Sequence, residues 1–177
     1  MNSFLFFQLG MAALVVLLAP LQADSLLPLK NSNFEAGKSG WTDDKGSSEV
    51  VADAARKGSG GLRVDDGDVV NYVRVISESV SVIPGKNYRL SVAARQNSGH
   101  GANAILWFLD EEGELIPAAD DQRLLVGPPE DEDTSWREFS VAGVAPANAV
   151  SAQVYIQSNR VAVGVIDFDE IRLEQVD

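Results

Sequence analysis

A strict alternation over residues 88–95 is the feature that most restricts what this chain can fold into. The apolar positions are Tyr88, Leu90, Val92 and Ala94, and the positions between them are Arg89, Ser91, Ala93 and Arg95. Successive side chains of a β-strand point to opposite faces of a sheet, whereas a helix groups residues three or four apart. The alternation therefore predicts a strand with one buried face and with Ser91 and Arg95 directed outward.

Further segments have the apolar, β-branched and aromatic composition of strands. They are residues 69–82, 104–109, 136–141, 150–157 and 161–173. Glycine and proline in the gaps, as in Pro84-Gly85, indicate turns. The segment 104–109 is apolar on both faces and is expected to be a central strand. Beyond one short turn within residues 51–56, no helix is expected, and many short strands predict an all-β sandwich or barrel.

The first 23 residues carry no charged side chain and include the apolar run Leu9–Leu18, which ends before Pro20. With Ala23 as a small residue before Asp24, this segment predicts a secretory signal peptide cleaved near Ala23. The alternative is an uncleaved membrane anchor, but a span needs about 20 apolar residues. Residues 24–177 are then one secreted domain, periplasmic or extracellular. Because the chain has no cysteine, burial rather than disulfides must stabilise it.

Charge and side-chain inventory exclude several classes of function. The net charge is −12 and basic residues do not cluster, which argues against nucleic acid and anionic membranes as partners. The single histidine, His100, lies in a glycine-flanked loop, and no nucleophile elbow or paired-histidine zinc motif is present. Acids such as those of residues 110–112 gather in turns. The sequence therefore predicts a protein that is not an enzyme, and it leaves the oligomeric state open.

Four stretches carry a resemblance when they are taken together and in order. They are NSNFEAGKSGW at Asn31–Trp41, GSGGLRV at Gly58–Val64, SVIPGKNYRLSVAAR at Ser81–Arg95, and WREFSVAGVAPANAVSAQVYI at Trp136–Ile156 continuing into IDFDEIRL at Ile166–Leu173. The set resembles carbohydrate-binding modules of the galactose-binding-like jelly-roll class, the type that accompanies xylanases and glucanases. The resemblance implies a two-sheet antiparallel β-sandwich with its first and last strands side by side.

The resemblance also implies a structural calcium ion. Its ligands would include the carboxylates of Glu35 and Asp169, with backbone oxygens near Lys57, and Asn33 is a further candidate. Calcium takes six to eight oxygen ligands, which these groups would supply in part. The alternative is that Glu35 and Asp169 only accept hydrogen bonds from the backbone at strand ends.

A candidate ligand face follows from the phase of the strands. If Val154 and Ile156 face the core, the outward residues are Gln153, Tyr155 and Gln157, and Trp107 is out of phase with its apolar neighbours. Sugar sites combine aromatic faces with planar polar groups. We therefore expect Arg95, Trp107, Gln153, Tyr155 and Gln157 to form a cleft on one concave sheet that binds a polysaccharide or glycan, with a neutral β-glucan or xylan favoured. The alternative places both aromatics in the core, in a structural or protein-interaction domain without a glycan ligand.

Overall fold

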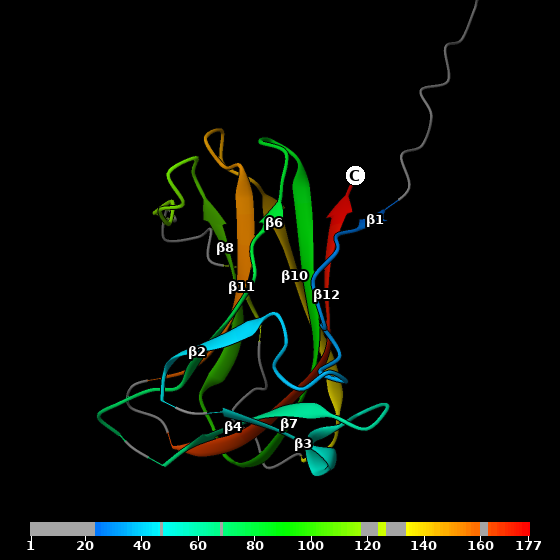
Figure 1. Cartoon of the computed structure of the whole chain (residues 1–177), viewed down its shortest axis with the longest axis vertical. Helices are drawn as coiled ribbons and strands as arrows, with labels where there is room; N and C mark the ends of the chain where they lie inside the picture. The colour runs from blue at the N-terminus through cyan, green and yellow to red at the C-terminus, as the bar shows by residue number, and fades with distance from the viewer. Residues whose placement is uncertain (1–23, 47, 68, 118–123, 127–133, 160–162) are drawn as a thin grey trace, which may run out of the picture.

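The computed structural model describes residues 24–46, 48–67, 69–117, 124–126, 134–159 and 163–177. Two antiparallel sheets of six strands each pack face to face as a β-sandwich (Figure 1). The predicted signal segment 1–23 and most of the acidic stretch 117–133 lie outside the described residues. Within the described ranges, no helix has the length and apolar character needed to cross a membrane.

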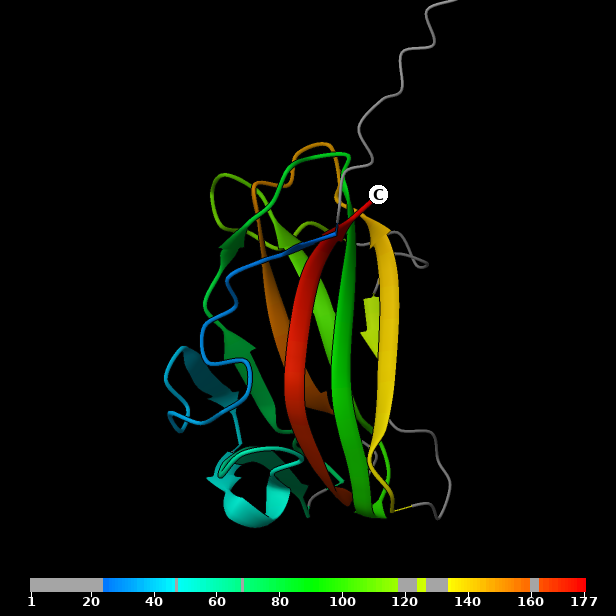
Figure 2. The ribbon, with the colours of Figure 1, turned by 90° about the vertical axis from the view of Figure 1, so that its right-hand side faces the viewer.

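Sheet A contains both long strands of the molecule and has the order β10-β7-β12-β4-β3, with β1 also pairing with β12 (Figure 2). Its strands are β1 (Ser25–Leu26), β3 (Ser48–Val51), β4 (Gly61–Asp66), β7 (Asn87–Gly99), β10 (Arg137–Val144) and β12 (Gly164–Val176). The first and last strands pair antiparallel, with Ser25 opposite Gln175. This arrangement confirms the neighbouring chain ends that the resemblance implied.

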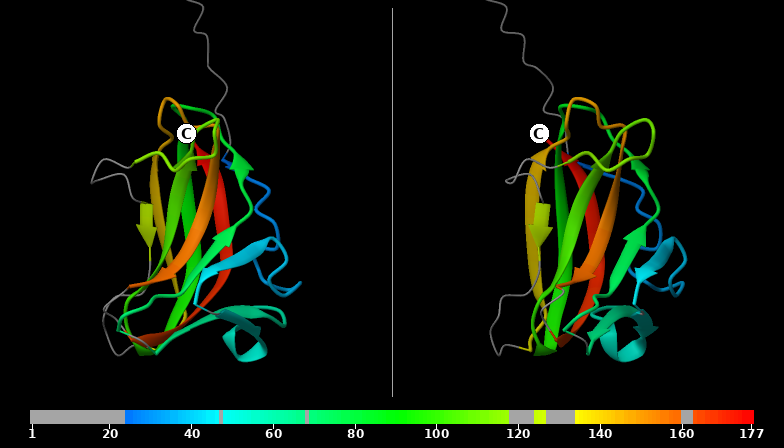
Figure 3. Two further views of the ribbon diagram at one scale, coloured as in Figure 1. Left: turned by 60° about the vertical axis from the view of Figure 1, so that its left-hand side comes forward. Right: turned by 90° about the vertical axis from the view of Figure 1, so that its left-hand side faces the viewer.

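Sheet B has the order β2-β5-β11-β8-β9, with β6 also pairing with β11. Its strands are β2 (Trp41–Lys45), β5 (Arg74–Ser77), β6 (Val80–Ser81), β8 (Ala102–Leu109), β9 (Leu124–Val126) and β11 (Ser151–Ser158). Figure 3 (right) faces this sheet, with β8 and β11 near its middle. The central position of β8 confirms the prediction for residues 104–109.

The core lies between the sheets and follows the predicted alternation. In β7 the side chains of Tyr88, Leu90, Val92 and Ala94 are all buried, and in β11 those of Val154 and Ile156 are completely buried. The aromatic pair Phe34 and Trp41 is also buried, with ring centroids 5.2 Å apart. The turn that joins them is therefore anchored to the core at both ends, because each large ring removes much apolar surface from water.

The prediction of one strand over residues 69–82 is wrong. Val69 and Val70 are exposed, and the segment contains two separate strands, β5 and β6. High β-propensity forms a strand only where a neighbouring strand and a buried face are available. Conversely, β2 has the sequence WTDDK and no apolar alternation, yet it pairs with β5. The short helical turn expected within residues 51–56 is present as the 3-10 turn η1 (Ala52–Ala54).

Candidate functional site

The outer face of sheet B brings together four of the five residues predicted for ligand binding. Antiparallel register places Trp107 opposite Gln153, and Asn103 opposite Gln157, across the β8–β11 pair. Tyr155 lies between the two glutamines on the same face of β11, because side chains alternate along a strand. The predicted outward phase of these residues is correct, since Leu106, Phe108, Val154 and Ile156 are in the core.

The two aromatic rings on this face differ in exposure. Trp107 is half-buried, whereas Tyr155 is only 7% exposed. The ring centroids are 6.2 Å apart and the ring planes are tilted by 56°. Gln153 Nε2 donates to the Ser77 carbonyl at 3.1 Å, which fixes this amide beside the rings. Trp107 is therefore the aromatic group that a ligand can reach most easily, and Tyr155 mainly supports it.

An arginine on β5 completes the face and was missed in the sequence. The Arg74 guanidinium carbon lies 5.6 Å from the ring centroids of both Tyr72 and Tyr155. Its Nε donates to Asp44 Oδ2 at 2.6 Å, and Arg74 faces Gln157 across the β5–β11 pair. A lone arginine flanked by Val73 and Val75 was the available signal. Its carboxylate partner lies in β2, a strand that the sequence pattern did not reveal.

The tyrosine ring beside Arg74 has a perturbed hydroxyl group. Burial raises the pKa of Tyr155 above its ordinary value, and the nearby positive charge of Arg74 offsets part of this effect. A cation over an aromatic face is attracted by the electron density of the ring, so Arg74 and Tyr155 hold one another in place. The result is a fixed row of planar groups along β11 and β5.

The prediction that Arg95 joins this face is wrong. Arg95 points outward from β7, but β7 belongs to sheet A, so the core separates it from β8 and β11. Its Nη2 donates to Asp167 Oδ2 at 2.6 Å, and its guanidinium carbon is 4.9 Å from the Trp136 ring centroid. Burial alone would raise the pKa of Asp167, but hydrogen bonds from Arg63, Arg95 and Asn97 lower it overall.

The two carboxylates predicted to bind calcium contact a single segment, residues 52–60, which we call the strap. Glu35 Oε1 accepts hydrogen bonds from Ser59 N at 2.8 Å and Gly60 N at 3.1 Å, and Oε2 accepts one from Ser59 Oγ at 2.7 Å. These bonds lower the pKa of Glu35. Glu35 therefore holds the C-terminal part of the strap.

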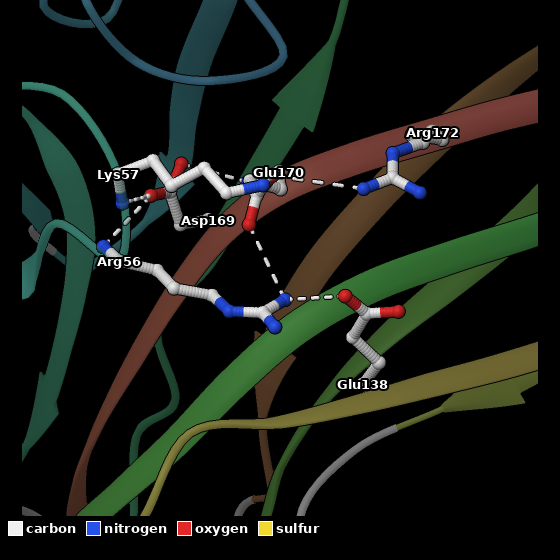
Figure 4. A network of polar contacts seen from close by, with 6 residues as sticks. All are labelled: Arg56, Lys57, Glu138, Asp169, Glu170 and Arg172. Carbon is white, nitrogen blue, oxygen red and sulfur yellow. Dashed lines mark hydrogen bonds and ion pairs between the residues drawn. The ribbon is translucent and has the colours of Figure 1, made fainter.

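Asp169 holds the preceding part of the strap and is fully buried. Its Oδ2 accepts hydrogen bonds from Arg56 N at 2.8 Å and Lys57 N at 3.1 Å, and its Oδ1 accepts one from Glu170 N at 2.7 Å (Figure 4). Burial nevertheless raises the pKa of Asp169. Glu170, which has a positive φ of 49° at a bulge in β12, pairs with Lys57 at 2.7 Å.

The chain's family is decided by sequence comparison. The profile of a family described as "Carbohydrate binding domain" matches residues 28–162, which is more than half of the chain. The chain belongs to this carbohydrate-binding domain family. No curated protein matches it.

Solved structures similar to this carbohydrate-binding domain share its fold at low sequence identity. Tailspike protein 4 of bacteriophage CBA120 has a TM-score of 0.67 at 15% identity, over 85% of this chain and 21% of that one. The Family 16 Carbohydrate Binding Module-2 has a TM-score of 0.60 at 19% identity, over 84% and 99%. The CBM22-1-GH10 part of Clostridium thermocellum xylanase 10B, complexed with xylohexaose, has a TM-score of 0.59 at 18% identity, over 82% and 28%.

The share of each similar protein that this chain spans shows which part of that protein it resembles. The chain spans 21% of the tailspike chain and 28% of the xylanase chain, but it spans 99% of the isolated family 16 module. The likeness therefore corresponds to one β-sandwich module and confirms the two-sheet jelly-roll architecture. It does not carry the activity of the larger chains to this domain.

The calcium prediction can be examined against the donor set in this carbohydrate-binding domain. An ionised carboxylate has about four lone-pair sites, and the hydrogen bonds of Glu35 and Asp169 occupy three on each. Each can therefore supply one further contact, and main-chain carbonyls or water would complete the shell. Asn33 is exposed and borders a hollow of about 390 Å³ next to Glu170. Two carboxylates with one acceptor position each can supply part of a calcium shell. Among the residues that the structure describes, no group of three or more His, Cys, Asp or Glu side chains is placed to hold a metal ion, and calcium stays a prediction.

Proposed function

We propose that this domain is a secreted, non-catalytic module that binds a neutral polysaccharide on the outer face of sheet B. The observation that carries the proposal is the half-buried Trp107 ring opposite the planar amide of Gln153, with Gln157 further along the same face of β11. An aromatic face covers the apolar side of a sugar ring, while amides pair with its hydroxyl groups. The family assignment supports the same class of ligand.

Each group on the face has a distinct part in this proposal. Trp107 stacks on one sugar unit, and Gln157 and Asn103, about 13 Å further along the strands, bond the hydroxyl groups of another unit of the same polysaccharide. Arg74 contributes N–H donors, but its charge is balanced by Asp44. Because this pair is neutral and the protein carries a net charge of −12, a neutral glycan is favoured over an acidic one.

Two similar structures are consistent with such a ligand. One is a xylan-binding domain from CBM 22, and another is TmCBM61 in complex with β-1,4-galactotriose. The galactotriose is a neutral β-linked sugar. For the present chain we propose the xylan class first. Each polar contact contributes about 1 kcal/mol net, so a stacked ring and a few such contacts give a dissociation constant on the order of 100 μM.

The test is a binding titration of residues 24–177 with xylohexaose. We expect Trp107→Ala to weaken binding by about tenfold or more, because the stacking face is lost. Asn148→Ala, an exposed position in the turn between β10 and β11, is the control and should bind like the parent. Melting curves must show that Trp107→Ala is folded. A folded Trp107→Ala variant with the parent's affinity would overturn the assignment of this face.

We propose in addition that calcium binds between Glu35 and Asp169 and stabilises the fold. The support is the convergence of two carboxylates on one strap, each with a lone pair remaining. An ion there would connect the segment before β2, the strap and β12. Its contribution would be to stability, because the outer face of sheet B is formed by other strands.

A further inference from the structure

The outer face of sheet A carries a second row of aligned planar groups. Register places Asp167 of β12 between Arg95 of β7 and Arg63 of β4, and Arg63 faces Glu49 of β3. Trp136 immediately precedes β10, whose first residue lies opposite Ala94, so Trp136 is beside Arg95. With neighbouring strands about 4.8 Å apart, the five groups extend over roughly 19 Å. Figure 2 faces the β10, β7 and β12 part of this sheet.

The middle of this row is rigid. Arg63 Nε donates to Asp167 Oδ1 at 2.8 Å and Nη2 donates to Oδ2 at 3.0 Å, a two-pronged pair with a fully buried carboxylate. Arg95 binds the same carboxylate and also donates to the Asp53 carbonyl of η1. Both guanidinium groups therefore have fixed planes, and their side chains remain 22% and 24% exposed. Fixed donors lose little conformational entropy when they bind a ligand.

A gain in folding stability does not by itself explain why this row of charged residues is present. A buried ion pair is weak evidence for stability, because desolvating the charges costs about as much as their attraction returns. The outer face of a strand could carry serine or threonine at lower cost. Among the described contacts, Nε and Nη2 of Arg63 make its hydrogen bonds, which leaves the N–H groups of Nη1 for a partner.

A hollow of about 430 Å³ adjoins the row at Arg63. Its lining residues are Ser48, Glu49, Arg63 and Asp65. Carboxylates accept hydrogen bonds from hydroxyl groups, and the guanidinium donates to their oxygens. An anionic ligand would be repelled by Glu49 and Asp65, so the set fits a neutral polyhydroxyl compound. The half-buried Trp136 supplies an aromatic group at the other end of the row.

We propose that the outer face of sheet A is a second binding site for a neutral saccharide, formed by Glu49, Arg63 and Trp136. This goes beyond the proposed function, because the two sites lie on opposite faces of the sandwich. A domain with two such faces can contact two polysaccharide chains, or two parts of one chain. Simultaneous contacts raise the overall affinity without any new residue at either site.

The test follows backbone amide shifts of isotope-labelled residues 24–177 during titration with xylohexaose. The variants are Trp107→Ala, Trp136→Ala and Glu49→Gln. We expect parent shifts near residues 48–49, 63–65 and 136 as well as near 107 and 153–157. In Trp107→Ala the sheet A shifts should persist, and the xylohexaose concentration at their midpoint should be unchanged. Trp136→Ala and Glu49→Gln should each raise that midpoint concentration at least about threefold.

The outcomes separate this proposal from the proposed function. Shifts confined to sheet B would overturn the second site and leave the first intact. Shifts confined to sheet A would do the reverse. Glu49 is exposed at an edge strand, so Glu49→Gln tests the site even if Trp136→Ala is unfolded. The second site would also be rejected if a folded Glu49→Gln variant kept the parent's midpoint concentration for the sheet A shifts, while Trp136→Ala either kept it too or was unfolded.

Discussion

Single side chains on the outer face of sheet B have environments that the local sequence does not reveal. The phase of Tyr155 could be predicted, because Val154 and Ile156 are apolar and alternate with it. Its 7% exposure could not, because that depends on Arg74 of β5 and Trp107 of β8, which are distant in sequence. A pattern within one strand gives the direction of a side chain. Its neighbours across the sheet are set by tertiary pairing.

The buried hydroxyl of Tyr155 gives a prediction about alkaline pH. Burial raises the pKa of Tyr155, with Arg74 opposing part of the effect. The neutral hydroxyl therefore adds stability that is fully present below the ordinary pKa of about 10 and is lost as pH rises through the folded value. Melting temperatures between about pH 8 and pH 11 should fall less steeply for Tyr155→Phe than for the parent. Parallel curves would contradict this assignment.

At the scale of elements, alternation predicted β7, and apolar composition predicted β8 and β11, but neither signal could assign these strands to sheets. Arg95 was correctly placed on an outward face and wrongly grouped with Tyr155, because strand order is decided by long-range packing. The strands β2, β3 and β4 lacked a clear alternating signal, since charged residues such as Asp43 and Glu49 interrupt it. The strap was visible only as a short turn, although it crosses sheet A and contacts β4, β7, β10 and β12.

The close approach of the strap to β4 gives a second prediction. A Cβ atom at Gly61 would lie 1.7 Å from the Ala54 carbonyl oxygen, so backbone would have to move. Gly61→Ala should lower the free energy of unfolding by about 1–3 kcal/mol. Gly67 follows the same strand and has open space around it, so Gly67→Ala should change stability by less than about 0.5 kcal/mol. Urea unfolding of both variants measures the difference. Equal stabilities would show that the strap shifts without cost.

For the whole molecule, the proposed calcium ion gives a third prediction. An ion that binds only the folded state stabilises it by mass action, by about 2.7 kcal/mol at a hundredfold excess over its dissociation constant. A chelator should therefore lower the melting temperature of the parent and have little effect on Glu35→Gln. Glu138→Gln, at the neighbouring Arg56 pair, should respond like the parent. A parent melting curve that a chelator does not move would exclude a stabilising ion.

The place of β12 in sheet A also bears on when the protein can fold. This strand is the last in the sequence, yet it lies between β7 and β4 and also pairs with β1. Until residues 164–176 have been synthesised, sheet A is divided into two parts that cannot pair with each other. Such long-range pairing slows folding, because a large loop must close before the contacts form. The two parts of sheet A can therefore join only after residues 164–176 have been synthesised, and Ile166 and Phe168, which fill the core between the sheets, become available only then.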